Sequence, residues 1–297
     1  MSLVIVGSIG LDSVETPVGC VEDILGGSAV YGSVAASHFA DVNIVGVVGE
    51  DFPKSAIELL KSRKICLDGM EIMPGKTFRW KGKYLNFNQA ETLQTDLNVF
   101  ADFSPKLPDN CRACHSLLLG NIHPALQLQV LEAVTDYSLV ACDTMNYWIN
   151  LCPDLLSEVI RKVHVVLINE DEIKLYTGEQ SIFKGAIALL DMGVKVVIVK
   201  RGEYGSVTIT ADSNYFSPAY PVDQVKDTTG AGDSFAGGFL GFLANGGSLD
   251  QEHIRKAVRY GTVMAALNVS DFSVYGMLGR TREEIDNMET NLREWTR

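Results

Sequence analysis

Short runs of apolar residues recur along most of this chain, and helical patterns separate them. The runs are rich in Val, Ile and Leu, which is typical of strands buried on both faces of a parallel sheet. They cover residues 3–6, 42–48, 116–119, 138–142, 164–168 and 195–200. Helices are expected over 28–39 and 55–62, and from Gly230, Gln251 and Thr281 onward. Because strands alternate with helices, the pattern predicts an α/β fold with a doubly wound, mostly parallel sheet flanked by helices.

One part of the chain departs from this alternation. Residues 71–90 carry Phe78 and Trp80 among interleaved lysines and arginines, and their alternation is typical of antiparallel strands with one face in water. Residues 12–24 are expected to add a strand to the same sheet. We therefore predict one α/β domain over residues 1–297, with a small β-sheet inserted at about 12–24 and 71–90.

The composition narrows the classes of function. The chain has 297 residues and a net charge of −12 at pH 7, which argues against a general binder of nucleic acid or of anionic membranes. The six cysteines are scattered, and only Cys111 and Cys114 form a close pair in the sequence. Because no second pair accompanies them, the sequence does not contain the four ligands of a structural zinc site. No signal-peptide pattern is evident, and the apolar runs are too short to span a bilayer. We expect a cytoplasmic protein with reduced thiols.

The most informative segment is 227–233, Asp-Thr-Thr-Gly-Ala-Gly-Asp, which leads into an apolar helix of small residues. Unpaired N–H groups at a helix start attract anions, and Gly230, Ala231 and Gly232 leave room for close approach. A carboxylate at Asp233 repels an anion, but it is suited to take a proton from a hydroxyl that attacks a phosphate. The segment indicates a phosphoryl-transfer site with Asp233 as the base.

A second candidate pair follows the apolar run at 164–168. Asn169 and Glu172 are expected at the carboxyl edge of the sheet, where open α/β sheets bind ligands. At i and i+3 they share one helix face and offer oxygen ligands to Mg²⁺, directly or through water. The same spacing is that of a helix N-cap with its capping-box carboxylate, which spacing alone favours. Both interpretations stay open.

The segment at 227–240 closely resembles the signature of the ribokinase-like (PfkB) family of carbohydrate and nucleoside kinases. Three weaker patterns follow the family's order along the chain, at 7–12, at 26–29 with 45–51, and at 169–172. The resemblance implies an ATP-dependent kinase that phosphorylates a hydroxyl of a small sugar or sugar-like substrate. It also implies a ribokinase-like fold whose inserted sheet is a lid over the acceptor. Because such lids often pair between subunits, it implies a homodimer through the lid.

The resemblance gives roles to residues on the acceptor side. Asp12, Gly26 and Gly27 would bind the substrate. One position departs from the family pattern, because many relatives carry Asn four residues after the second glycine, where this chain has Tyr31. The usual contact to a sugar hydroxyl is therefore in doubt here.

For the nucleotide and its ions, the resemblance implies five ATP-binding residues and two cation sites. The ATP-binding residues would be Lys200, Gly202, Gly205, Asn268 and Gly276. The turn at 200–205 also fits a plain hairpin. Asn169 and Glu172 would hold Mg²⁺, and Asp227 and Thr229 would offer oxygens to K⁺.

Three hypotheses of function remain. The leading one is the sugar kinase, and its main variant is a nucleoside kinase in which Phe78 or Trp80 stacks the base. An NAD(P)-dependent oxidoreductase would leave Asp233 without a role. A non-catalytic nucleotide or metabolite sensor would bind without turnover, and it is weakened because candidate base, anion hole and metal residues are all present.

Overall fold

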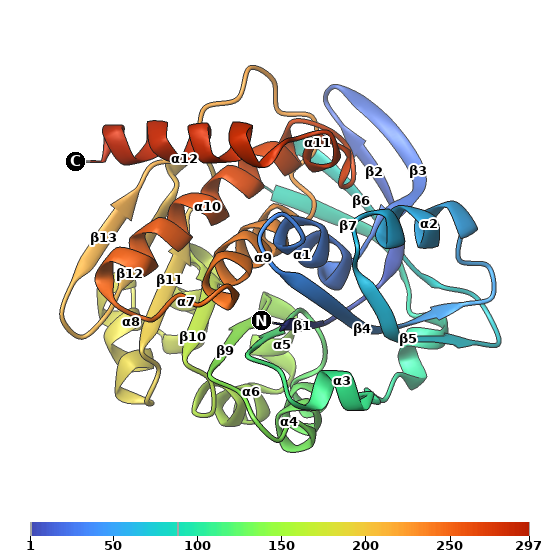
Figure 1. Cartoon of the computed structure of the whole chain (residues 1–297), viewed down its shortest axis with the longest axis horizontal. Helices are drawn as coiled ribbons and strands as arrows, with labels where there is room; N and C mark the ends of the chain where they lie inside the picture. Colours follow the sequence, from blue (N-terminus) through green and yellow to red (C-terminus); the bar gives the residue numbers. More distant parts are fainter. Residues whose placement is uncertain (1, 88, 297) are drawn as a thin grey trace.

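A large sheet forms the centre of the molecule. The computed structural model describes residues 2–87 and 89–296, and Figure 1 shows helices around this sheet and a smaller sheet beside it. In the described residues the large sheet has the strand order β13-β12-β11-β10-β9-β8-β1-β4-β5. The bounds are β1 Ser2–Val6, β4 Asp41–Gly49, β5 Cys66–Met73, β8 Ser116–Leu119, β9 Leu139–Asp143, β10 Val165–Asn169, β11 Val196–Lys200, β12 Ser206–Ile209 and β13 Asn214–Ser217. The strands from β5 to β11 are parallel, and β12 and β13 add an antiparallel edge. The six expected strands are confirmed.

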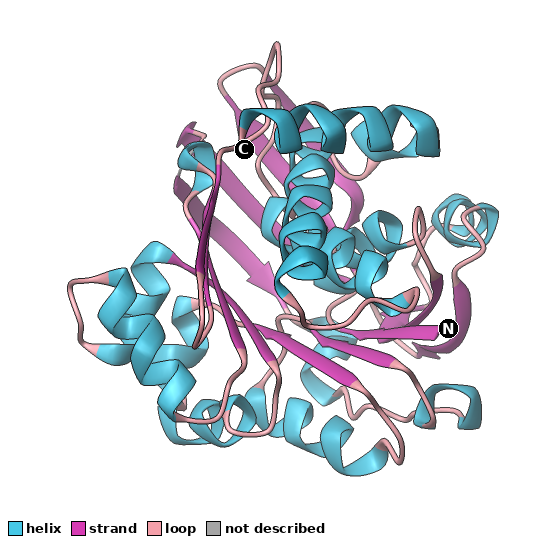
Figure 2. Ribbon diagram, turned by 60° about the vertical axis from the view of Figure 1, so that its left-hand side comes forward, coloured by secondary structure: helices cyan, strands magenta, loops and turns pink. Residues whose placement is uncertain are grey.

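Helices cover both faces of the large sheet (Figure 2). One face packs against α1 Ser28–Ala36, α2 Lys54–Ser62, α9 Ala231–Ala244, α10 Gln251–Val269, α11 Tyr275–Leu278 and α12 Arg282–Trp295. The other packs against α3 Asp109–Arg112, α4 Pro124–Ala133, α5 Asn146–Leu151, α6 Pro153–Ile160, α7 Glu170–Thr177 and α8 Ile182–Asp191. Two 3-10 helices, η1 Asn98–Asp102 and η2 Gly202–Tyr204, lie in connections. The doubly wound arrangement is confirmed.

The small sheet contains one strand more than expected. It consists of β2 (Gly10–Thr16), β3 (Gly19–Gly26), β6 (Phe78–Asn86) and β7 (Gln89–Asp96), in the order β3-β2-β6-β7. The antiparallel pairing expected within 71–90 is confirmed for β6 and β7, but the first segment forms an antiparallel pair of strands instead of one strand, and its β2 pairs with β6 in parallel. The reason is topological, because β2 follows β1 and β6 follows β5. Both preceding strands belong to the parallel part of the large sheet, so the chain leaves that sheet twice in the same direction.

This small sheet is the lid. Segments expected at about 12–24 and 71–90 occupy 10–26 and 78–96 in the structure. Residues 71–73 instead end β5 in the large sheet, and Asn88, within the expected segment, lies outside the described residues. The lid is therefore longer at its C-terminal side than the alternating pattern indicates.

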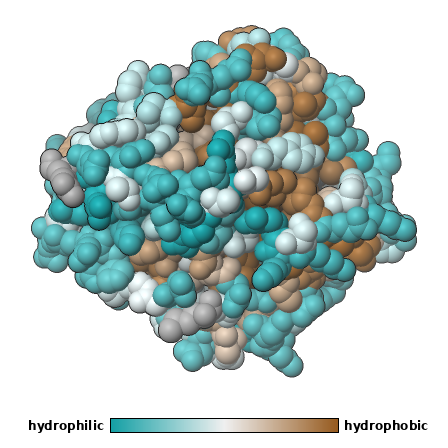
Figure 3. Space-filling model, turned by 45° about the horizontal axis from the view of Figure 1, so that its top comes forward, coloured by the Kyte–Doolittle hydropathy of each residue, from teal (hydrophilic) through white to brown (hydrophobic). Residues whose placement is uncertain are grey.

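The surface mixes polar and apolar side chains. Figure 3 shows a mostly hydrophilic face on which hydrophobic residues gather in separate patches. On the lid, the exposed large apolar side chains include Leu85 and Leu93. Within residues 2–87 and 89–296, no helix has both the length and the apolar character needed to cross a bilayer.

Candidate active site

Helix α9 starts at a glycine that no other residue could easily replace. Gly230 has a φ of 74°, in the left-handed region that glycine enters at little cost. A Cβ atom at this position would lie 2.3 Å from the ring of Tyr31 on α1. The sequence thus needs a glycine here both for the backbone turn and for the contact with the tyrosine.

The first turn of α9 presents backbone N–H groups to the edge of the sheet. The N–H of Ala231 donates to the carbonyl of Thr228 at 3.2 Å, which closes the turn before the helix. Gly232 and Asp233 follow at positions where helix N–H groups have no partner within the helix and the dipole favours an anion. The glycine-rich turn predicted to bind an anion thus has two N–H groups without helical partners, whereas the Ala231 N–H is engaged in closing the turn.

A buried ion pair lies against this turn. The Lys200 Nζ atom is 2.7 and 2.9 Å from the two carboxylate oxygens of Asp143, and the two side chains are 17% and 7% exposed. They come from the carboxyl ends of β11 and β9. A Cβ atom on Gly232 would lie 2.9 Å from this Nζ atom. The glycine thus allows the ammonium group to approach the start of the helix.

Asp233 is half-buried in this charged setting. Its pKa is raised to about 7, first by the loss of contact with water and then by the charge of Asp143, and the charge of Lys200 acts in the opposite direction. Glu172 on α7 also raises this pKa. A carboxyl group that titrates near neutral pH is a stronger base than an ordinary one and is suited to accept a proton.

Asn169 and Glu172 form the capping box that their spacing favours. Asn169 Oδ1 accepts from the Glu172 N–H at 2.8 Å, and Glu172 Oε2 accepts from the Asn169 N–H at 3.0 Å. The pKa of Glu172 is raised to about 7, mainly by burial, although the charge of Lys200 acts to lower it. Among the described residues, no group of three or more His, Cys, Asp or Glu side chains could hold a metal ion. Any Mg²⁺ here would depend on water and phosphate oxygens for most of its ligands.

The acceptor-side residues cluster between the lid and α1. Asp12 on β2 is buried, and the Tyr31 hydroxyl donates to its Oδ2 atom at 3.4 Å. Burial raises the pKa of Asp12 to about 7, with a further contribution from the charge of Asp227. A Cβ atom on Gly26 would lie 2.0 Å from the Asp12 carboxylate. Gly27 directly precedes α1 as its N-cap, so Asp12, Gly26 and Gly27 are brought together as expected.

Polar contacts brace the loop before α9. Asp227 is 1% exposed; its Oδ1 accepts from the Thr229 N–H at 2.9 Å, and its buried Oδ2 has no partner among the described residues. The Asn268 amide donates to the Thr229 carbonyl at 2.8 Å and accepts from the Ser234 hydroxyl at 3.1 Å. Asn268 is thus buried beneath the anion-binding turn, where it supports the loop.

The lid reaches the same loop. The Thr229 hydroxyl donates to the Tyr84 hydroxyl at 3.1 Å, and the Thr228 hydroxyl donates to the Phe87 carbonyl at 2.8 Å. Because both contacts join β6 and its turn to the entrance of α9, a closed lid braces the turn that would receive the phosphate.

Three further glycines, Gly202, Gly205 and Gly276, were expected to bind ATP. Gly202 and Gly205 have φ of 55° and 84° and form the tight connection from β11 to β12. Gly276 lies in α11, where a Cβ atom would be 2.0 Å from the Leu267 carbonyl. Of the five predicted ATP-binding residues, the structure brings Lys200 to the first turn of α9 and Asn268 to the loop before that helix.

Sequence analysis missed two residues of this site. Asp143 ends the apolar run of β9 just as Asn169 and Lys200 end theirs, and that shared position was an available signal. Tyr84 gave no signal of this kind, because its contact with Thr229 joins residues far apart in sequence.

Comparisons with known proteins show the family and the fold of this chain. The model of the pfkB family carbohydrate kinases matches residues 7–278. The cytidine kinase of Thermococcus kodakarensis is 29% identical over 261 residues, which cover 84% of this chain and 91% of that protein. The ribokinase of Thermotoga maritima has a TM-score of 0.78 at 24% identity, with 98% and 100% of the two chains covered. The aminoimidazole riboside kinase of Salmonella enterica, solved with aminoimidazole riboside and an ATP analog, has a TM-score of 0.76 at 18% identity, with coverages of 97% and 100%.

A family match over most of the chain thus accompanies a ribokinase-like fold with its lid. Kinases of this family act on sugars or nucleosides. The chain belongs to the PfkB family of carbohydrate kinases.

Proposed function

We propose that this kinase transfers the γ-phosphoryl group of ATP to a hydroxyl of a small sugar or sugar-like acceptor. The observation that carries the proposal is the half-buried carboxyl group of Asp233 in the first turn of α9, with a pKa of about 7. Its neighbours are a glycine-lined helix entrance and the ammonium group of Lys200. Base, anion site and cation are the three elements that phosphoryl transfer requires.

In the proposed reaction, Asp233 accepts the proton of the acceptor hydroxyl as that oxygen bonds to the γ-phosphorus. The bond from the γ-phosphorus to the bridging oxygen breaks, and ADP leaves with its electron pair. Gly230, Ala231 and Gly232 form a wall without large side chains, and the N–H groups at this turn stabilise the charge on the moving phosphoryl oxygens. Lys200 neutralises part of the phosphate charge from the sheet side.

The nucleotide would extend from this turn along the edge of the sheet. We propose that Gly202 and Gly205, in the turn after Lys200, and Gly276 on α11 border the ATP site. Asn268 would support the ATP site indirectly, because its amide donates to the Thr229 carbonyl in the loop before α9. This assignment follows the family resemblance and the common position of these residues after β11 and α10.

Two cations fit the charges of the site. Asp143, Glu172 and Asp233 outnumber the single positive charge of Lys200, and ATP brings further negative charge, so a dication would offset part of this excess. Asn169 and Glu172 would hold Mg²⁺ through water, because their capping-box contacts remain in place. Mg²⁺ supplies neutralisation of the nucleotide phosphates. The unpartnered Asp227 Oδ2 atom and the nearby Thr229 fit a K⁺ ion that braces the loop.

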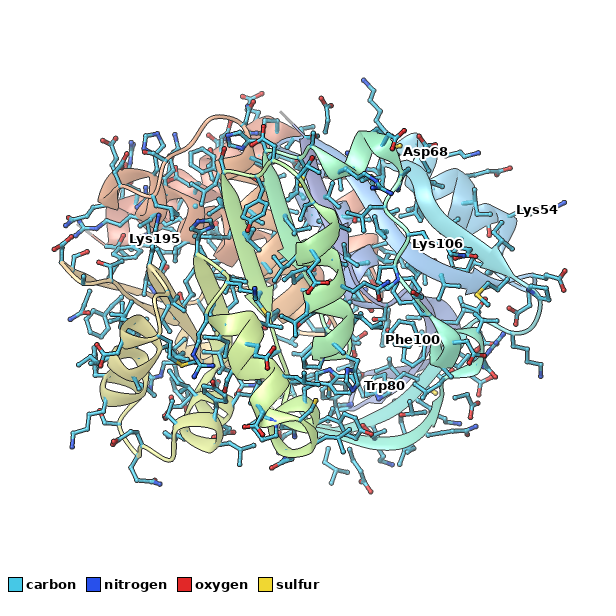
Figure 4. All side chains as sticks on the ribbon, turned by 90° about the horizontal axis from the view of Figure 1, so that it is seen from below. Lys54, Asp68, Trp80, Phe100, Lys106 and Lys195 are labelled. Carbon is cyan, nitrogen blue, oxygen red and sulfur yellow. The ribbon has the colours of Figure 1, made fainter. Side chains whose placement is uncertain are left out.

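A nucleoside is the second candidate acceptor. Asp12 and Trp80 are register partners on the parallel strands β2 and β6, so their side chains leave the same face of the lid. A base could stack on Trp80 while the ribose contacts Asp12. Phe78 is engaged elsewhere, with its ring 5.3 Å from that of Phe100; Figure 4 labels Trp80 and Phe100 at this end of the molecule. The similarity to a cytidine kinase favours this variant.

We also propose a homodimer through the lid. Leu85 is 72% exposed and Leu93 is 47% exposed on strands β6 and β7. Large apolar side chains exposed on an open sheet favour burial against a second copy. Sedimentation of the wild type and of Leu85→Glu tests this: the proposal expects a dimer that the charge dissociates, and a monomeric wild type contradicts it.

The experiment for the function is a coupled ADP-release screen over pentoses, hexoses, inositols and nucleosides, with and without K⁺. We expect acceptor-dependent ADP release with at least one sugar or nucleoside, and its loss in Asp233→Asn. Release that does not depend on any acceptor, or an Asp233→Asn variant with wild-type turnover, contradicts the proposal. Turnover of nucleosides but not of free sugars would establish the second candidate.

A further inference from the structure

The reaction proposed above gives Asp143 no step of its own, yet this residue holds the ammonium group of Lys200 beside the first turn of α9. Resting on that proposed function, we propose that Asp143 is a positioning residue: it holds Lys200 beside Gly232 so that the ammonium group meets the transferred phosphoryl group of ATP. Lys200 is then the catalytic partner, and Asp143 acts through it.

The geometry of the pair supports this role. Both carboxylate oxygens of Asp143 lie within 2.9 Å of Lys200 Nζ. The position of a Cβ atom on Gly232 is 2.9 Å from that Nζ atom and 3.9 Å from Asp143 Oδ2. A lysine stem is flexible, and a buried carboxylate on one side of the ammonium group restricts it to one place.

The carboxylate is itself held in position. Asp143 Oδ1 accepts from the Thr144 N–H at 3.0 Å, and the Gln127 amide donates to the Asp143 carbonyl at 3.4 Å. Asp143 and Lys200 lie on β9 and β11, with β10 between them, so the pair bridges across the carboxyl end of a strand. A contact across this edge is placed where ligands bind, rather than in the interior of the sheet.

The pair also acts on the base through its charges. Asp143 raises the pKa of Asp233 and Lys200 lowers it. The other charged or titratable groups that face Asp233 are Glu172 from α7, Asp12 from β2 and Tyr31 from α1. Removal of the Asp143 charge therefore moves the pKa of Asp233 down, and removal of the Lys200 charge moves it up.

The test compares Asp143→Asn, Asp143→Glu and Lys200→Met in the full chain. Calorimetry with Mg²⁺ and either AMP-PNP or ADP measures binding. We expect about tenfold weaker AMP-PNP binding in Asp143→Asn and Lys200→Met, because a charged hydrogen bond to the terminal phosphate is lost or misplaced. ADP binding should change by no more than about twofold, since ADP lacks that phosphate. Asp143→Glu should recover part of the difference. Equal weakening for both nucleotides, or for neither, overturns the proposal.

Turnover with cytidine and with ribose gives a second readout. We expect kcat/KM to fall about 100-fold in Asp143→Asn because Lys200 is misplaced. The acidic limb is the part of the pH profile in which kcat/KM falls as the pH decreases. This limb should move to lower pH in Asp143→Asn and to higher pH in Lys200→Met. An unchanged limb in Asp143→Asn overturns the proposal. If the wild type turns over neither acceptor, the proposed acceptors fail, and the AMP-PNP comparison still decides the role of Asp143.

A matched control removes a buried carboxylate elsewhere. Glu289 accepts from Arg259 at 2.6 Å, with both side chains less than 10% exposed, on helices α12 and α10. Glu289→Gln should lower the unfolding temperature while leaving the AMP-PNP to ADP ratio and the pH limb unchanged. If Glu289→Gln reproduces the Asp143→Asn effects, they reflect general destabilisation and the proposal fails. If Asp143→Asn does not fold, Lys200→Arg is tested in its place. The arginine keeps the positive charge but puts it in a different position, so we expect the same selective loss of AMP-PNP binding. Wild-type binding of AMP-PNP by Lys200→Arg overturns the proposal.

Discussion

We expect the raised pKa of Asp233 to make catalysis sensitive to pH in a range where an ordinary aspartate would have no effect. Because burial raises this pKa from 3.8 to about 7, the base loses its charge when the pH falls below neutral. About one-tenth of the enzyme then carries an ionised base at pH 6, and about one-hundredth at pH 5. We therefore expect kcat/KM to fall about tenfold per pH unit below 7.

The assay is the pH profile of kcat/KM for the acceptor, from pH 5 to 9 at saturating Mg²⁺ and ATP. Glu172 also has a raised pKa of about 7, so Glu172→Gln is the matched variant: the acidic limb should persist in it. A wild-type profile in which kcat/KM stays constant down to pH 5 would refute the reasoning. Loss of the pH dependence below pH 7 in Glu172→Gln would also refute it.

Unfolding cannot account for the expected loss of activity. A carboxyl group whose pKa is raised in the folded state contributes stability that is present at low pH and is lost as the pH rises through about 7. Asp12, Glu172 and Asp233 all share this direction. Acidification from pH 8 to pH 6 should therefore leave these sites no less stable, which thermal unfolding at the two pH values checks.

Three further predictions concern the loops and ions. Gly230→Ala should lower the free energy of unfolding by more than about 1 kcal/mol in urea titrations, because the residue has a positive φ and faces the Tyr31 ring; wild-type stability would contradict this. Glu172→Gln should raise the Mg²⁺ concentration for half-maximal rate, and an unchanged titration would leave Glu172 a structural cap. Asp227→Ala should abolish activation by K⁺ relative to Na⁺, and retention of that activation would place the ion elsewhere.

Local patterns predicted the elements of the large sheet because burial on both faces demands continuous apolar runs. The spacing of Asn169 and Glu172 likewise predicted their capping box, since both partners lie within one helical turn. The glycine-rich entrance of α9 was predictable for the same local reason. What these features share is a short distance along the chain.

Features that depend on distant contacts were not predictable in this way. The parallel pairing of β2 with β6 follows from the paths of two separate excursions out of the large sheet. The pair of Asp143 with Lys200 joins residues 57 positions apart, and no periodicity in the sequence relates them. The sequence marked Tyr31 only as a departure from the family pattern, whereas in the structure its hydroxyl reaches Asp12 and its ring lies against Gly230.

Single-turnover kinetics of Asp233→Asn test the central claim most directly. Excess enzyme is mixed with limiting labelled ATP, Mg²⁺ and the acceptor from the screen, and phosphorylated acceptor is quantified by rapid quench. The account predicts that transfer slows by about 100-fold to 10,000-fold, while the dissociation constant for AMP-PNP stays within about threefold of the wild-type value. Transfer at the wild-type rate would contradict the assignment of Asp233 as the group that accepts the proton.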